Sequence, residues 1–92
     1  MVVAEFSIIP IVEGSLRSYV KTAVAAIEAS GLKYEVGAMG TTIEGTLDEV
    51  FDAIKSAHRA VLAAGAGRVV TSIKIDDREG GLSIEGKLEG LR

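Results

Sequence analysis

Residues 34–45 read YEVGAMGTTIEG and contain two strand-like runs that meet at a Gly-Ala-Met-Gly turn. Side chains of a strand alternate between the two faces of a sheet, so Thr42 and Glu44 point to one face. Thr41 and Ile43 point to the other. Two polar side chains on one strand face, in a chain that is 48% hydrophobic, indicate either a wet surface or a place that holds a small polar ligand.

The hairpin that this stretch predicts consists of residues 33–39 and 41–45, with Gly40 at its tip. We expect Gly40 to adopt a positive φ angle there, because glycine takes that conformation without strain. Alternating runs rich in Val, Ile and Phe predict two further strands, over residues 2–9 and 68–76.

Two helices are predicted between these strands. Apolar side chains recur at helical spacing over residues 16–30, and Gly31 supplies the usual left-handed stop. Thr46 and Glu49 form a capping-box pattern, in which each side chain accepts a hydrogen bond from the other residue's backbone N–H. The helix that they open carries an apolar face and closes near residues 65–67.

The elements therefore follow the order βαββαβ, and residues 82–92 form an extension with a turn or two of helix. Two split β-α-β units with right-handed crossovers give a four-stranded antiparallel sheet with both helices on one face. The sequence thus predicts one α+β domain, a ferredoxin-like sandwich, over residues 1–92.

Strand parity separates core residues from those of the opposite face, which we call the open face because no predicted helix of the sandwich covers it. The expected core positions of the first and last strands are Phe6, Ile8, Val69, Thr71, Ile73 and Ile75. The expected open-face residues are Val3, Glu5, Ser7, Ile9, Glu35, Gly37, Met39, Thr42, Glu44, Val70, Ser72, Lys74 and Asp76. This mixture is typical of a subunit interface that encloses a polar pocket, because ligand sites combine an apolar wall with a few placed polar groups. A solvated face without a ligand is the alternative.

Charge and composition restrict the classes of function. The 10 basic and 13 acidic residues give a net charge of −3 without a basic cluster, which argues against binding to nucleic acid or to an anionic membrane. The absence of cysteine excludes thiolate metal sites and a cysteine nucleophile. Glu5 follows the start too closely for a signal peptide, and no apolar run approaches the ~18 residues of a membrane span. We therefore expect a cytoplasmic protein.

Catalysis has little support in the sequence. His58 is the only histidine, and no Cys or Asp stands near it at metal-ligand spacing. Glu5 and Glu44 could act as an acid–base pair if adjacent strands bring them together. No nucleophile elbow, phosphate loop or metal motif accompanies them. We expect no catalytic residue, no metal and no cofactor.

Several segments resemble the small thiamin-binding protein family, the YkoF-like group. They are AEFSIIP (residues 4–10), YEVG (34–37), MGTTIEG (39–45), IKIDDR (73–78) and Lys87. The resemblance covers nearly the whole chain in the family's order and spacing. It implies the ferredoxin-like fold, homodimers and tetramers formed through the sheets, and thiamin or its hydroxymethylpyrimidine part as a ligand.

Carried over by matching position, the resemblance implies a set of residues near the ligand. They are Glu5, Ser7, Met39, Thr42 and Glu44, with Tyr34, Lys74 and Asp76 added from the same open surface and the tail match. The chain departs from the family at residues 79–82, which lack the second basic residue that many members carry. Two other functions stay open: a metabolite or anion sensor that acts through a protein partner, and a carboxylate-dependent enzyme.

Overall fold

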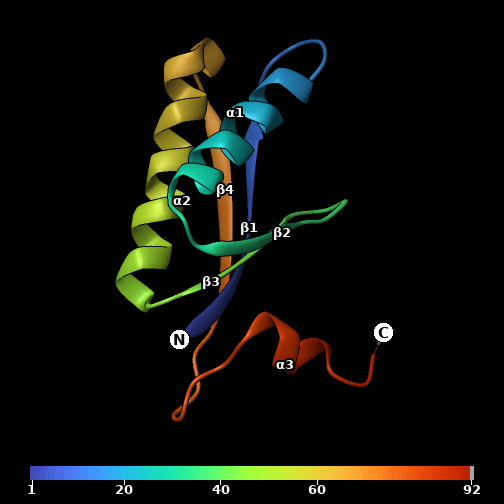
Figure 1. The fold of residues 1–92 in the computed structure, drawn as a ribbon. Helices are drawn as coiled ribbons and strands as arrows, with labels where there is room; N and C mark the ends of the chain where they lie inside the picture. Colours follow the sequence, from blue (N-terminus) through green and yellow to red (C-terminus); the bar gives the residue numbers. More distant parts are fainter. Residues whose placement is uncertain (92) are drawn as a thin grey trace.

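A computed structural model describes residues 1–91 and has the predicted order of elements (Figure 1). Residue 92, the last of the predicted extension, lies outside the described residues. The strands are β1 (Val2–Pro10), β2 (Lys33–Val36), β3 (Thr41–Gly45) and β4 (Val69–Asp76). The helices are α1 (Arg17–Ala29), α2 (Leu47–Val61), a π-helical turn η1 (Leu62–Ala66) and α3 (Ile84–Leu88).

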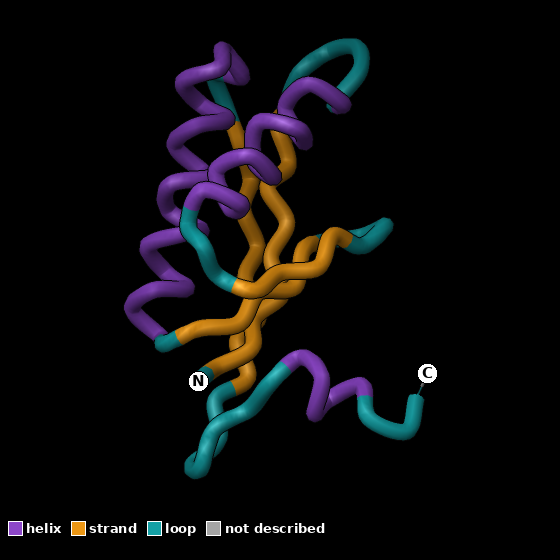
Figure 2. The backbone as a smooth tube through the Cα atoms, viewed as in Figure 1, coloured by secondary structure: helices purple, strands orange, loops and turns teal. Residues whose placement is uncertain are grey.

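The strands form one antiparallel sheet in the order β2-β3-β1-β4. In Figure 2 the two long helices lie together on one side of the orange strands, and the short helix α3 lies apart from them. The ferredoxin-like α+β sandwich predicted from the sequence is confirmed. No helix within residues 1–91 is both long and apolar enough to cross a membrane.

The core lies between the two central strands and the two long helices. Its buried residues are Val2, Ala4, Phe6, Ile27, Ile43, Val50, Ala53, Ile54 and Ala57. The predicted core position of Ile73 was wrong: its side chain is 42% exposed, because β4 is an edge strand and the buried cluster lies over the middle of the sheet. Val3 is buried although its parity places it on the open face.

The predicted helix signals are confirmed at both helices. The Thr46 hydroxyl accepts the Glu49 N–H at 3.2 Å, and the Glu49 carboxylate accepts the Thr46 N–H at 3.0 Å. This capping box satisfies two of the N–H groups that a helix start leaves unpaired. At the end of α1, Gly31 has a φ of 74°.

The hairpin loop corrects one prediction. Gly40 is not among the glycines with positive φ within residues 1–91, so the expected left-handed conformation was wrong. Glycine is needed there for space, because an added Cβ would lie 3.1 Å from the Phe6 carbonyl oxygen and 3.1 Å from the Ser7 hydroxyl. The loop itself is closed by the Gly37 N–H, which donates to the Gly40 carbonyl at 2.8 Å.

The C-terminal segment turns back onto the sheet after β4. The Leu82 N–H donates to the Met1 carbonyl at 3.0 Å, which fixes the segment beside the start of β1. Ser83 caps α3 by accepting the Gly86 N–H at 2.9 Å. Ile84 is only 2% exposed, so this short helix is anchored by an apolar side chain as well as by polar contacts.

Candidate functional site

The open face is ordered in rows, because residues paired across neighbouring strands lie side by side. The first, which we call the end row, consists of Lys33, Glu44, Val3 and Asp76. The second, the central row, consists of Glu35, Thr42, Glu5 and Lys74. Beyond them Ser7 pairs with Ser72, and Ile9 with Val70. The residues of β1, β3 and β4 predicted to share this face do share it, as does Glu35 of β2.

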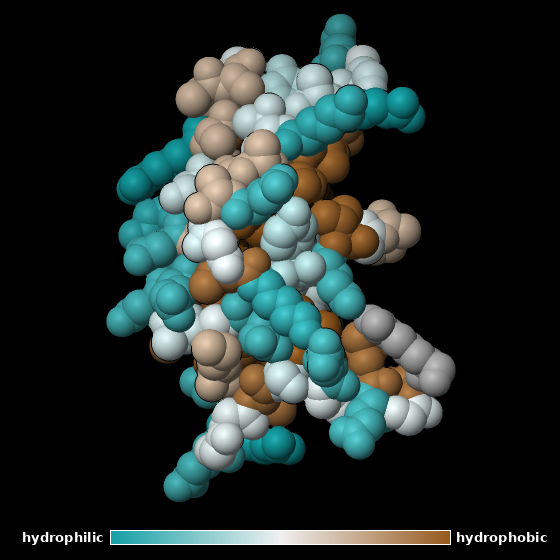
Figure 3. Space-filling model, in the orientation of Figure 1, coloured by the Kyte–Doolittle hydropathy of each residue, from teal (hydrophilic) through white to brown (hydrophobic). Residues whose placement is uncertain are grey.

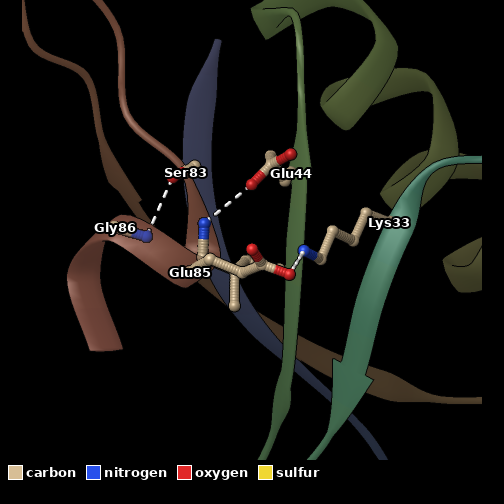
Figure 4. A network of polar contacts seen from close by, with 6 residues as sticks. Lys33, Glu44, Ser83, Glu85 and Gly86 are labelled. Carbon is tan, nitrogen blue, oxygen red and sulfur yellow. Dashed lines mark hydrogen bonds and ion pairs between the residues drawn. The ribbon is translucent and has the colours of Figure 1, made fainter. Parts of the chain in front are cut away.

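Helix α3 covers the end row. One carboxylate oxygen of Glu44 accepts the Ile84 N–H at 2.7 Å. Figure 4 draws this contact as the dashed line that leaves Glu44. Val3, in the same row, is only 5% exposed. The structure therefore places Glu44, one of the residues that the resemblance implied near a ligand, in contact with the C-terminal segment of its own chain.

Two ion pairs at the sheet edges join the same row to α3. The Lys33 ammonium lies 2.7 Å from a Glu85 carboxylate oxygen (Figure 4), and the Lys87 ammonium contacts the Asp76 carboxylate. The hydrogen bond to Glu85 raises the pKa of Lys33 above its ordinary value, assisted by the negative charges of Glu85, Glu44 and Glu35, while partial desolvation opposes the shift. Helix α3 is thus held by one ion pair at each end of the end row.

The central row remains open to solvent. Glu5, Thr42 and Lys74 line a cavity of about 510 Å³ together with Val3, Ala4, Ile75, Asp76 and Lys87. Within residues 1–91 no hydrogen bond or ion pair engages the side chains of Glu5, Thr42 or Lys74. A carboxylate, a hydroxyl and an ammonium therefore stand next to one another with their hydrogen-bonding capacity unused.

Ser7 and Met39 lie at the hairpin end of the face rather than in the central row. The Ser7 hydroxyl donates to the Met39 carbonyl at 3.0 Å, and the Met39 side chain is 89% exposed. The Ser7 side chain thus holds the loop by binding the backbone of Met39, and the Met39 side chain stays exposed to solvent. The resemblance implied that Ser7 and Met39 both lie near a ligand. The structure brings them together through a hydrogen bond that holds the hairpin loop.

An apolar hollow adjoins the hairpin loop on the helix side of the sheet. It measures about 300 Å³ and includes Ile8, Leu16, Val20 and Met39 in its lining. Figure 3 shows apolar surface in the hollow beside the projecting hairpin. The sequence analysis did not predict that the start of α1 lines this hollow. The signal was the pair of aliphatic residues Leu16 and Val20, whose side chains are exposed.

The placement of Tyr34 on the open surface was wrong. Tyr34 pairs with Ile43, whose side chain belongs to the core, and the tyrosine packs against that core from the helix side. Adjacent residues of a strand face opposite sides, so only its neighbour Glu35 lies on the open face.

The described part of the chain has neither a cluster of potential metal ligands nor an unpartnered buried polar side chain. No group of three or more His, Cys, Asp or Glu side chains within residues 1–91 is arranged to hold a metal ion. A ring nitrogen of His58 lies 2.7 Å from the Thr71 hydroxyl, so this histidine joins α2 to β4 at the edge of the core. These same residues include no buried side-chain polar atom without a partner.

Several known proteins are similar to this chain over most of its length. Residues 4–92 match the family model described as thiamine-binding protein. A UPF0045 protein of Methanothermobacter thermautotrophicus is 48% identical over 81 residues, which are 85% of this chain and 82% of that protein.

Two solved structures have the same fold and cover almost the whole chain. A domain of unknown function from Bacillus cereus has a TM-score of 0.93 at 42% identity, over 99% of this chain and 89% of that one. A proposed thiamine biosynthesis/salvage protein from Thermotoga maritima has a TM-score of 0.90 at 34% identity, over 99% of this chain and 98% of that one.

Proposed function

The chain belongs to the thiamine-binding protein family, and we propose that it binds thiamin or a related pyrimidine at the central row of its open sheet face. The proposed role is binding without catalysis. The observation that carries the proposal is the unpaired Glu5 carboxylate beside the Thr42 hydroxyl over an open cavity of about 510 Å³.

The chemistry of thiamin fits these groups. Its thiazolium carries a permanent positive charge and its pyrimidine carries an amino group, so Glu5 can balance the charge or accept a hydrogen bond. Thr42 can donate or accept beside it. Ile9 and Val70 continue the face two rows away, and their exposed side chains give an aromatic ring an apolar surface. Lys74, on the other side of Glu5, suits a phosphate ester of the same ligand.

Assembly is part of the proposal. An open face that mixes exposed aliphatic side chains with polar groups would be covered by the same face of a second copy, giving a homodimer that can stack further into a tetramer. The ligand would then lie between sheets, where water is partly excluded and a charge-assisted hydrogen bond is stronger. We also propose that the protein acts in the cytoplasm, a setting that its lack of cysteine fits.

Titration calorimetry with thiamin tests the binding site. Glu5→Gln keeps the side-chain shape and removes the charge, so it should weaken binding by about 1.5–3 kcal/mol, the range for a hydrogen bond to a charged group. Thr42→Val should also weaken binding and leave the fold intact. Glu13→Gln, which removes an exposed carboxylate from the β1–α1 connection, is the matched control and should bind like the parent.

Two results would reject the proposal: no measurable binding of thiamin by the parent at millimolar concentration, or unchanged affinity in Glu5→Gln. A thermal-shift comparison of thiamin, thiamin phosphates, the isolated pyrimidine and inorganic anions separates the main alternatives. Stabilisation by inorganic anions alone would instead favour an anion sensor that uses Lys74.

A further inference from the structure

The β4 side of the central-row cavity carries two ammonium groups from different parts of the chain. Lys74 belongs to β4, and Lys87 belongs to the last turn of α3. Both line the cavity of about 510 Å³ that also contains Glu5 and Thr42. Thiamin itself is a cation, so its charge gives no reason for two ammonium groups beside its proposed site.

Helix α3 brings Lys87 to the cavity from across the end row. The Ile84 side chain is buried and the Ile84 N–H donates to Glu44, so the start of α3 is fixed over the sheet. The Lys87 ammonium contacts the Asp76 carboxylate. Asp76 follows Lys74 by two residues on the same face of β4, a separation of about 7 Å along the strand. Lysine side chains are long and flexible, so both ammonium groups can reach one anion of the size of a phosphate.

Both ammonium groups have hydrogen-bonding capacity left for such an anion. An ammonium has three N–H donors, and the contact with Asp76 uses one donor of Lys87. The Lys87 side chain is 41% exposed, so its other donors are accessible. No hydrogen bond or ion pair within residues 1–91 engages the Lys74 side chain.

The charges of the cavity are also separated along the row. Glu5 lies directly opposite Lys74 in the ladder between β1 and β4, and Thr42 lies on the other side of Glu5. A carboxylate in the middle of the sheet therefore stands beside an ammonium toward the β4 edge. Electrostatic complementarity favours a ligand in which a positive charge and a negative charge lie in the same order.

We propose that the ligand of the central row carries a phosphate ester as well as a positively charged ring. Lys74 and Lys87 bind the phosphate, and Glu5 faces the ring. This inference rests on the proposed function and names the class of ligand for the same site, with thiamin monophosphate as its simplest member. In that compound a short carbon chain joins the phosphate to the thiazolium, so the opposite charges are close together in one molecule.

The charge of a phosphate ester explains why the site has two cations. A phosphate monoester carries about −1.5 to −2 charges at neutral pH, so a single ammonium balances only part of it. The second ammonium is present only when α3 is docked, because Lys87 is carried by that helix. Docking of α3 and binding of the phosphate should therefore favour each other.

Calorimetry with thiamin and thiamin monophosphate at low ionic strength tests the inference. The monophosphate should bind about tenfold more tightly, because each partly exposed charge pair contributes up to about fivefold. Lys74→Gln and Lys87→Gln should each lower this ratio to about threefold, and the double variant should abolish it. The ratio is the measurement that matters, because damage to the fold weakens the binding of both ligands and leaves their ratio unchanged.

A matched control is needed because Lys87→Gln also breaks the ion pair with Asp76. Lys33→Gln breaks the other ion pair that holds α3, and Lys33 does not line the cavity. It should therefore keep the tenfold ratio. Lys87→Arg retains the positive charge and should keep most of it. An equal loss of the ratio in Lys33→Gln and Lys87→Gln would overturn the inference, since Lys87 would then only hold α3 in place.

Hydrogen exchange gives a second measurement on the same complexes. Thiamin monophosphate should slow the exchange of the Gly86 N–H, which donates to Ser83 in α3, at least about threefold more than thiamin does at equal saturation. Equal protection by the two ligands would overturn the contact with Lys87.

The outcomes separate this inference from the proposed function. If the parent binds thiamin through Glu5 but does not prefer the monophosphate, the inference fails and the proposed function stands. If the parent binds neither ligand, both fail. Equal affinity for inorganic phosphate and for thiamin monophosphate also overturns the inference, because the positively charged ring would then contribute nothing.

Discussion

The hydrogen bond between Glu44 and the backbone of Ile84 is expected to hold the C-terminal helix on the sheet. The carboxylate oxygen lies 2.7 Å from the Ile84 nitrogen, in the first turn of α3. Glu44→Ala removes the acceptor and leaves that N–H without its partner. Glu44→Gln keeps an oxygen in place but removes the negative charge, so the two variants separate the hydrogen bond from its charge.

The size of the effect follows from the type of bond. A hydrogen bond to a charged group contributes about 1.5–3 kcal/mol, and a neutral one about 1 kcal/mol. Glu44→Ala should destabilise the docked α3 by roughly the first amount, and Glu44→Gln by less. Because each 1.4 kcal/mol is a factor of ten, α3 in the Ala variant should open about 10- to 100-fold more often. Ile84 stays available for burial and limits the loss.

Hydrogen exchange measures this opening at single residues. The reporters are the N–H groups of Gly86 and Lys87, which donate to the hydroxyl and carbonyl of Ser83. The reference is the Val50 N–H in α2, which donates to the Thr46 carbonyl. Unchanged exchange at the reporters in Glu44→Ala, or equal acceleration at Val50, would show that Glu44 does not act by docking α3.

Three further predictions concern the sheet, the core and the start of α2. Gly40→Ala should lower the free energy of unfolding by about 1–3 kcal/mol in urea, because its Cβ would press on the Phe6 carbonyl; an unchanged midpoint would contradict this. Ile54→Ala should cost about 2–5 kcal/mol by leaving a cavity, and a thermal midpoint equal to the parent's would refute it. The backbone hydrogen bond from Thr46 lowers the pKa of Glu49 below its ordinary value of 4.5, so the stability that it adds is complete above that value and lost as pH falls through the folded-state pKa. Glu49→Gln should flatten that acidic part of the melting profile, and an identical profile would count against the capping box.

The fold could be predicted because its signals are local. Thr46 and Glu49 mark a helix start within four residues, and Gly31 marks a helix end in one. Strand parity also placed Glu5, Thr42 and Lys74 on one face without any knowledge of the structure. The misplacement of Tyr34 was avoidable, since the same parity puts it opposite Glu35.

Features that depend on contacts between distant parts of the chain could not be predicted from local signals. Glu44 meets Ile84 across forty residues, and nothing in a five-residue helix predicts where it docks. Gly40 was predicted to be a turn glycine, because sequence does not distinguish a requirement for positive φ from a requirement for space. The structure distinguishes the two requirements, because Phe6 and Ser7 of β1 lie against Gly40 and leave no room for a Cβ.

The docked tail changes which carboxylate is available to a cationic ligand. Glu44 is occupied by the α3 backbone and Asp76 by Lys87, whereas Glu5 has no such partner within the described chain. A ligand at the central row needs no movement of the tail. A ligand that used Glu44 would first have to break the hydrogen bond to Ile84 and expose its buried side chain, so it would bind more weakly by the free energy of that opening. Loss of thiamin affinity in Glu44→Gln together with faster hydrogen exchange in α3 would therefore indicate an indirect effect through the docking of α3. The Glu5→Gln variant tests ligand contact alone, because no hydrogen bond or ion pair joins Glu5 to α3 in the described chain.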